Sequence, residues 1–414
     1  MNLGRTVFSQ VVGFLPDREF RRCVDRYNGD SRHKEGGFSC WDQFLCMSFA
    51  QLTYREGLRD IEACLRSAPA KLYHMGIRGR VSRATLADAN ERHDWRIFAD
   101  FAGILIARAR ALYADDAFGE ELRLSAYALD STTIDLCLAI FPWARFRQNK
   151  GAVKMHTLLD LRGNIPSCVW ISNGKLSDVK ILDQLIPEAG SFYVMDRGYV
   201  DFARLRRFTT ASAFFVTRTK DNIKLKRRSS QTADPANGVI SDQTVVLATD
   251  ASREHYPGAL RRIRYHDADQ QRYLVFLTNN FEVSSLTIAK LYKARWQVEL
   301  FFKWIKQHLR IKAFYGTSLN AVKTQIWIAI TIYVLIATIK KELALSPSLY
   351  QILQIVSVNI FEQTPILQAL QPGEPHNNSM EVSLKPQLIL IAELSTSLST
   401  KVRLFLLPNF VLRT

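Results

Sequence analysis

The chain has 414 residues, 47% of them hydrophobic, a composition that excludes an intrinsically disordered or collagen-like protein and predicts two or three domains. Lysine and arginine number 55 against 39 aspartate and glutamate residues, so the net charge is +16. This excess favours a polyanionic partner, because binding to phosphates releases condensed counterions; nucleic acid is the first candidate and an anionic membrane surface the second.

The N-terminal part of the chain is predicted to be helical. Apolar residues recur at three- and four-residue spacing from Trp41 to Leu52, and again from Trp95 to Leu112. Ser82 is well placed to cap a further helix. We therefore assign residues 1–118 to an all-helical N-terminal domain. Its expected role is DNA binding, and the alternative is a helical cap that makes no DNA contact.

The next segment carries the pattern of a mixed α/β sheet. Apolar stretches predict strands at 122–130, 152–160, 165–171, 192–195 and 214–217. The sequence Arg162-Gly163-Asn164 suits a hairpin turn between the second and third of these strands. A helix is expected at 178–186.

Residues from about 220 to 280 are polar and β-like, with strands expected at 244–248, 260–265 and 273–277. The start of this segment is basic, since residues 201–230 contain nine lysines and arginines against two aspartates. Lys224, Lys226, Arg227 and Arg228 fall in a strand-like pattern and are candidates for contact with a DNA backbone. A solvated charged surface is the alternative.

A long helix predicted at 285–309 carries a charged stripe. At about 100° per residue, Tyr292, Arg295, Glu299 and Lys306 lie within an arc of about 60°. Apolar residues are expected to wall the stripe on both sides: Leu291, Val298, Phe302, Ile305 and Leu309 on one side, and Trp296, Leu300 and Trp304 on the other. The pattern indicates a functional site, and the alternative is an intrahelical ion-pair ladder.

The remaining features concern the C-terminal part and the cysteines. The uncharged run between Lys323 and Lys340 has about 16 residues, too few to span a bilayer, and predicts a buried core helix. Beyond about Leu370 the sequence resembles an appended tail. The six cysteines have no CxxC pair or histidines at zinc-ligand spacing, so the sequence predicts neither disulfides nor structural zinc. We expect a soluble cytoplasmic protein with no membrane association.

Two aspartates, Asp130 and Asp196, each close an apolar strand. A carboxylate at the end of a buried strand needs a partner, although a turn or capping role is the alternative for either residue alone. Together with Glu299 they could bind two divalent cations about 4 Å apart, in a geometry for displacement at phosphorus. Mg²⁺ suits such an all-oxygen site. Asp135 is the main alternative to Asp130.

These residues resemble the motifs of a known family. The spacing Tyr292-x2-Arg295-x3-Glu299-x6-Lys306 resembles the Tyr-Arg-Glu-Lys motif of bacterial DDE transposases of the insertion-sequence-four family. The segments that begin at Asp130 and Asp196 resemble its first and second acidic motifs, and residues 8–10 and 38–44 resemble the amino-terminal domain of one subgroup. The resemblance covers roughly residues 1–370.

The resemblance implies an RNase H-like mixed-sheet catalytic core at 119–345, interrupted by a β-rich insertion at about 220–280 and followed by a helical region with an atypical tail at 346–414. It implies cut-and-paste transposition with Mg²⁺, for which Mn²⁺ would substitute. Asp130, Asp196 and Glu299 would be the catalytic metal ligands, while Tyr292, Arg295 and Lys306 would hold DNA phosphates.

The implied partners are double-stranded DNA, as terminal inverted repeats and target, and a second copy of the chain in a synaptic homodimer in the bacterial nucleoid. The chain departs from hairpin-forming members, which stack a flipped base on a tryptophan of the insertion, because it has no tryptophan between Trp170 and Trp296. The alternatives to a transposase are an RNase H-like nuclease without strand transfer and a catalytically silent DNA-binding protein.

Overall fold

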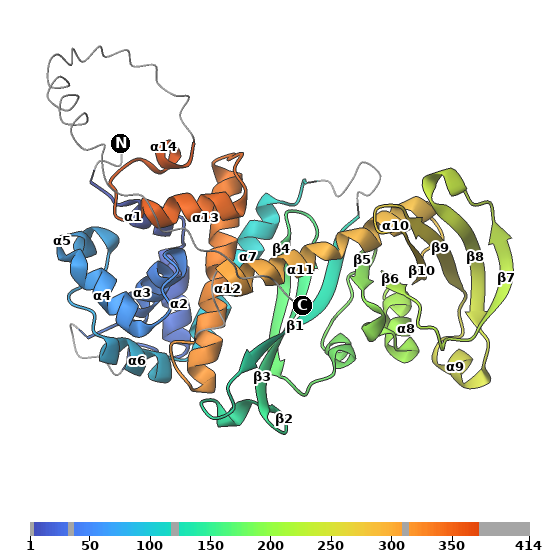
Figure 1. The fold of residues 1–414 in the computed structure, drawn as a ribbon, viewed down its shortest axis with the longest axis horizontal. Coiled ribbons are helices and arrows are strands. Elements are labelled where there is room, and N and C mark those ends of the chain that lie inside the picture. The colour runs from blue at the N-terminus through green and yellow to red at the C-terminus, as the bar shows by residue number, and fades with distance from the viewer. Residues whose placement is uncertain (1–3, 32–36, 117–123, 309–313, 372–414) are drawn as a thin grey trace, which may run out of the picture. The chain divides into compact units, whose positions relative to one another are not determined.

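The computed structural model describes residues 4–31, 37–116, 124–308 and 314–371, so the predicted tail beyond residue 371 lies outside the described residues. The N-terminal part is helical, as predicted, and Figure 1 shows its helices. Ser82 caps the helix that follows it by accepting a hydrogen bond from the Thr85 N–H at 3.1 Å. Its helices are α1 (Val7–Val12), α2 (Asp17–Arg26), α3 (Cys40–Leu52), α4 (Leu58–Ser67), α5 (Pro69–Leu72), α6 (Arg83–Arg92) and α7 (Trp95–Leu112).

The middle of the chain forms a ten-stranded mixed sheet within the described residues. The strands run in the order β2-β3-β1-β5-β6-β10-β9-β8-β7, and β4 also pairs with β3. The first strands are β1 (Ala126–Leu136), β2 (Arg145–Arg147), β3 (Lys150–Asp160), β4 (Ile165–Asn173), β5 (Phe192–Met195) and β6 (Phe214–Arg218). The polar segment adds β7 (Leu225–Gln231), β8 (Val239–Leu247), β9 (Leu260–Asp267) and β10 (Arg272–Thr278), with helix α9 (Asp250–His255) between β8 and β9.

The central strands are buried on both faces, and their alternating side chains belong to two different cores. Ala128 of β1 and Phe192 of β5 pack in the core that is shared with the N-terminal and C-terminal helices. Tyr127 and Tyr193, their neighbours in the sequence, pack in a second core beneath α8 (Phe202–Thr210). This period-2 partition explains why these strands read as continuous apolar runs.

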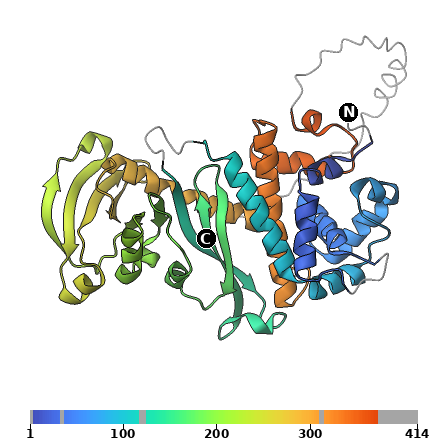
Figure 2. The same ribbon diagram turned by 180° about the vertical axis from the view of Figure 1, so that it is seen from behind.

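The helices after the sheet are α10 (Ser285–Ala294), α11 (Trp296–Lys303), α12 (Leu319–Glu342), α13 (Leu349–Val358) and α14 (Ile366–Leu370). Helix α12 is long and apolar enough to cross a membrane, but 94% of its most apolar window is buried within the protein. It lies against α7, as both views of the ribbon show (Figures 1 and 2). The prediction of a buried core helix between Lys323 and Lys340 is therefore confirmed.

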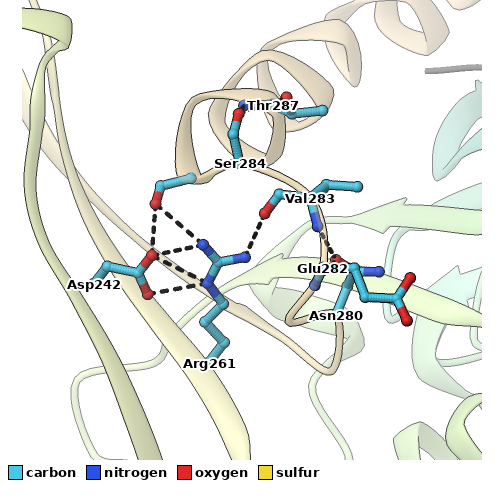
Figure 3. Close-up of polar contacts among 8 residues, drawn as sticks. Asp242, Arg261, Asn280, Glu282, Val283, Ser284 and Thr287 are labelled. Carbon is cyan, nitrogen blue, oxygen red and sulfur yellow. Dashed lines mark hydrogen bonds and ion pairs between the residues drawn. The ribbon is translucent and has the colours of Figure 1, made fainter. Parts of the chain in front are cut away.

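A buried ion pair joins the polar strands to the start of α10 (Figure 3). Arg261 of β9 and Asp242 of β8 are 4% and 2% exposed, and their closest nitrogen–oxygen distance is 2.6 Å. Arg261 also donates to the carbonyl of Val283 at 2.6 Å, and the hydroxyl of Ser285 donates to Asp242 at 2.6 Å. Since Ser285 is the first residue of α10, this cluster anchors the helix that leads to Glu299.

Two predicted helices differ from the structure. The segment expected at 178–186 is a shorter 3₁₀ helix, Asp178–Asp183. The single helix expected at 285–309 is divided into α10, α11 and a π-helix at Trp304–His308, and its last predicted residue lies outside the described residues. At the first division the Arg295 N–H bonds to the carbonyl of Tyr292, three residues back, so the helix tightens there. Side-chain periodicity does not reveal such a local change in hydrogen bonding.

Candidate active site

Two neighbouring parallel strands place Asp130 and Asp196 side by side. Strands β1 and β5 pair in parallel, with Leu129 opposite Met195, so the next residue of each strand path is an aspartate. Asp130 lies within β1, whereas Asp196 follows the last residue of β5. Both side chains are partly buried, with exposures of 21% and 33%. The structure thus brings together two of the three predicted carboxylates.

Arg295 connects the first aspartate to the third predicted carboxylate. One terminal nitrogen of its guanidinium donates to Asp130 at 2.7 Å, and the other donates to Glu299 at 2.6 Å. Arg295 stands between α10 and α11, and Glu299 lies one turn further along α11. The contact between Arg295 and Glu299 is also the i,i+4 pair of the alternative interpretation. The additional bond to Asp130 shows that this face of the helix meets the sheet.

Asp196 has a different set of partners. Arg218, at the end of β6, donates to its carboxylate at 2.8 Å, and the Tyr292 hydroxyl donates to the same oxygen at 3.2 Å. Burial by itself raises the pKa of Asp196, but the hydrogen bonds from Arg218 and the Arg197 backbone outweigh it and hold the pKa below its ordinary value. Asp196 is therefore ionised at neutral pH.

The pKa of Asp130 is shifted in the opposite direction, toward the neutral carboxyl group. Burial foremost, and then the carboxylates of Glu299 and Asp196, raise its pKa to about 6, although the Ser131 backbone N–H and Arg295 lower it. The shift therefore comes chiefly from burial, and the two neighbouring carboxylates add to it.

The remaining stripe residues follow the prediction in part. Lys306 donates to the carbonyl of Thr133 on β1 at 2.6 Å, so it also faces the sheet. On one side of the stripe the described residues of the apolar wall, Leu291, Val298, Phe302 and Ile305, are buried. On the other side only Trp304 is buried, whereas Trp296 and Leu300 are 57% and 40% exposed. The prediction that Trp296, Leu300 and Trp304 form an apolar wall was therefore wrong. Helical periodicity gives the position of each residue around the helix axis, but it does not show which faces of the helix are covered by other parts of the protein.

Sequence reasoning missed two neighbours of the carboxylates. Arg218 ends β6, the strand beside β5, and its position at that strand end was the available signal. Asp178, the first residue of the helix expected at 178–186, accepts a hydrogen bond from the Ser131 hydroxyl at 2.6 Å and lies 3.1 Å from the Lys154 amine. Ser131 follows Asp130 on β1, and Lys154 lies on the neighbouring strand β3, so the cluster of Ser131, Lys154 and Asp178 lies beside Asp130.

His156 belongs to this same cluster and is fully buried. Its Nε2 lies 2.9 Å from the Ser172 hydroxyl, and burial lowers its pKa to about 4. His156 is therefore neutral at ordinary pH, and its complete burial suits a side chain that packs within the sheet. Asp135, the alternative to Asp130, is exposed on the opposite face of β1, as expected for residues five apart on a strand.

The predicted basic residues lie elsewhere. Lys224, Lys226, Arg227 and Arg228 are exposed, and the last three belong to β7, the edge strand of the sheet. Strands β5, β6, β10, β9 and β8 separate β7 from β1. At about 4.8 Å per strand, the two are roughly 30 Å apart. The structure does not bring these basic residues to the carboxylates.

The donor set fits a hard divalent cation. Asp130, Asp196 and Glu299 offer only carboxylate oxygens, which Mg²⁺ and Mn²⁺ prefer. All three carboxylates accept hydrogen bonds from an arginine, Asp130 and Glu299 from Arg295 and Asp196 from Arg218. Asp196 and Glu299 are 33% and 34% exposed, so water and a substrate oxygen could reach the site.

The pKa of Asp130 predicts how stability depends on pH. In the unfolded chain this carboxyl ionises near its ordinary value of 3.8, whereas in the folded protein it ionises at about 6. Between these values the unfolded state releases its proton more readily, so Asp130 lowers the stability of the folded protein as the pH rises. In EDTA, the wild type should lose stability relative to Asp130→Asn from about pH 4 to pH 6, as measured by urea unfolding. Parallel pH profiles of the two proteins would contradict the assignment.

Comparison with protein families gives two matches. Residues 121–335, about half of the chain, match the family described as Transposase DDE domain. Residues 3–78 match a family described as a domain of unknown function, DUF4372. The first match contains both aspartates and Glu299.

Three curated proteins are similar to the chain over half of its length or more. The protein y4zB of Sinorhizobium fredii, named as a transposase, is 33% identical over 298 residues, which are 71% of the chain and 81% of that protein. A protein of Geobacillus stearothermophilus, named as a transposase for insertion sequence element IS5377, is 34% identical over 210 residues, 50% of the chain and 55% of its own length. A Synechocystis protein named for element IS4SA is 27% identical over 271 residues, 63% of the chain and 73% of its own length.

Among solved structures, piggyBac transposase in a synaptic complex with hairpin DNA is similar at a TM-score of 0.47 and 11% identity. The match covers 88% of this chain and 85% of that one.

Proposed function

Because the chain belongs to the transposase DDE domain family, we propose that it moves an insertion sequence by cut-and-paste transposition, with Asp130, Asp196 and Glu299 as its catalytic carboxylates. The observation that carries the proposal is the pair of bonds by which Arg295 joins Asp130 to Glu299, next to Asp196. These bonds bring Asp130 and Glu299, which are 169 positions apart in the sequence, to one arginine. Two relatives named for insertion sequence elements support the type of mobile element.

The proposed core is RNase H-like. The order β4-β3-β1-β5-β6, antiparallel as far as β1 and parallel from β1 to β6, supports this assignment. In this scheme residues 119–345 form the catalytic domain, and β7 to β10 are the β-rich insertion at about 220–280. Residues 1–118 and 346–414 are the flanking N-terminal and C-terminal regions in this proposal. The spacing of Tyr292, Arg295, Glu299 and Lys306 supports our proposal that the chain belongs to the insertion-sequence-four group.

DDE transposases generally use divalent metal ions. We propose Mg²⁺ held by Asp130, Asp196 and Glu299, with Mn²⁺ as a substitute. When bound, such ions supply an activated water and neutralise charge at the phosphate that is cleaved.

The protein's own side chains prepare this site. Arg218 and Tyr292 hold the Asp196 carboxylate in one orientation, and Arg295 aligns Asp130 with Glu299. Tyr292, Arg295 and Lys306 carry hydroxyl, guanidinium and ammonium donors, which are suited to DNA phosphates near the transposon end. In the structure, Tyr292 and Arg295 donate to carboxylates, and Lys306 donates to a backbone carbonyl.

The proposed partner is double-stranded DNA, both the terminal inverted repeats of the element and the target. The net charge of +16 and the exposed basic residues Lys224, Lys226, Arg227 and Arg228 on the edge of the sheet support DNA contacts away from the active site. We assign DNA binding to the N-terminal helices as well. The active form is proposed to be a homodimer that pairs two transposon ends in the bacterial cytoplasm.

The test is cleavage of the DNA that flanks the gene. Purified protein, incubated with this DNA and Mg²⁺, should cut at the element ends and join the released 3′ ends to a target plasmid. EDTA should abolish both steps. Cutting without joining would favour a nuclease, and binding without cutting in Mg²⁺ or Mn²⁺ would favour a silent DNA-binding protein.

A further inference from the structure

Three metal-ligating side chains meet in the helical N-terminal part, away from the carboxylates of the sheet. Asp30 lies in the turn after α2, Cys40 is the first residue of α3, and His93 follows the last residue of α6. Their ligand atoms all lie within 4.8 Å of one another. Cys40 and His93 are 0% and 3% exposed, whereas Asp30 is partly exposed.

The neighbours of His93 fix its ring in a metal-binding form. Gln43 donates through its amide nitrogen to the Asn90 side-chain oxygen at 2.7 Å, so its own oxygen faces the His93 Nδ1 at 2.6 Å and accepts a hydrogen bond from the Nδ1–H group. With Nδ1 protonated, Nε2 carries the lone pair of the neutral imidazole. Such a bond to the other ring nitrogen is the usual way in which a metal-binding histidine is oriented. The His93 carbonyl also accepts a bond from Asn320 of α12 at 2.8 Å.

The other two side chains are equally constrained. Asp30 accepts a hydrogen bond from the backbone N–H of Cys40 at 2.8 Å, which leaves lone pairs on its carboxylate for a further partner. The Cys40 thiol packs against Gly29, where a Cβ would lie 2.7 Å from the sulfur. A larger residue at position 29 would therefore displace the sulfur. Three separate segments hold the three ligand groups in place.

The charge of the cluster suits a divalent ion. Zinc binding would displace the proton of the Cys40 thiol. The resulting thiolate, the carboxylate and the neutral imidazole would carry two negative charges, which a divalent cation balances in this largely buried position. Sulfur and imidazole ligands favour zinc over the magnesium preferred by an all-oxygen site. Asp30, the partly exposed member of the cluster, also lines a cavity of about 1590 Å³.

We propose that Asp30, Cys40 and His93 form a zinc site that ties together the turn after α2, the start of α3 and the end of α6. The site is independent of the proposed catalytic function. It would stabilise the N-terminal helices, because metal binding to preformed ligands adds directly to the free energy of folding.

The experiment measures zinc in the full chain, expressed with added zinc and purified without chelator. We expect about one zinc ion per chain, and a loss of affinity of tenfold or more in Cys40→Ser and in His93→Asn. Cys46→Ser is the matched control, since Cys46 is a fully buried cysteine of the same helix outside the cluster. It should retain zinc. Wild-type protein without zinc, or unchanged binding by both ligand variants, would overturn the proposal.

Cobalt provides a second readout that does not depend on the stability of one variant. Replacing zinc by Co²⁺ should produce a thiolate-to-cobalt absorption band in the wild type and in Cys46→Ser. The catalytic carboxylates cannot produce this band, because they offer only oxygen. Absence of the band from the wild type, or its persistence in His93→Asn at unchanged Co²⁺ affinity, would count against the site.

Discussion

Replacing Glu299 by glutamine is expected to abolish excision of the element from its native flanks in cells. The amide keeps the shape of the side chain and can still accept a bond from Arg295, but it removes the negative charge that would bind the metal. Metal ions contribute several kcal/mol of transition-state stabilisation, so purified Glu299→Gln should cleave at least about a thousandfold more slowly. Its affinity for DNA should stay within about threefold, because many phosphate contacts share the binding energy.

Asp135→Asn is the matched control for this experiment. Asp135 lies on β1, five residues from Asp130, with an exposed side chain. The Asp135→Asn variant should excise the element at the wild-type level. Normal excision by Glu299→Gln would refute the catalytic assignment, and failure of the Asp135 variant would reopen the choice of the first ligand.

Replacing Arg261 by methionine is expected to lower the free energy of unfolding by about 3–5 kcal/mol. The change leaves the carboxylate of Asp242 buried without its cation, and the hydroxyl of Ser285 alone cannot balance that charge. The measurement is urea unfolding of both proteins. The double variant with Asp242→Leu should recover most of the loss, since it removes the stranded charge.

Arg21→Met is the control for this second experiment. Arg21 pairs with Asp17 on α2, but their side chains are 73% and 49% exposed. Solvent screens such a pair, so the substitution should change stability by less than about 1 kcal/mol. Equal effects of the two arginine substitutions would mean that the joint between β8, β9 and α10 contributes little to the fold.

The sequence predicted the local elements well because their signals are local. The strand at 192–195 was predicted at the residues where β5 lies, and the uncharged run formed the buried helix α12. The sequence also predicted that Tyr292, Arg295 and Lys306 share one face of the helical segment. In the structure all three side chains make hydrogen bonds to residues in or next to the sheet. Periodicity reports the direction of each side chain about its own axis, and these predictions needed nothing more.

Other features depend on which elements become neighbours. The pairing of β1 with β5 decides that Asp130 stands beside Asp196, and the position of β6 brings Arg218 to the same carboxylate. The sheet order also places the basic strand β7 far from the site. Nothing in the local pattern indicated that Trp296 would remain exposed on its helix.

The sequence alone predicted the strand that ends before Asp196, the charged helical stripe, the basic balance of the chain and the DDE transposase family. Its prediction that a strand ends at Asp130 was wrong, because β1 continues to Leu136. Which charges neutralise one another depends on the tertiary structure. It also brought together Asp30, Cys40 and His93, whose spacing of 10 and 53 residues matches no zinc motif. The reason is that strand pairing and helix packing join residues at any separation in the chain, whereas periodicity and motif spacing report only on residues within one element or one continuous segment.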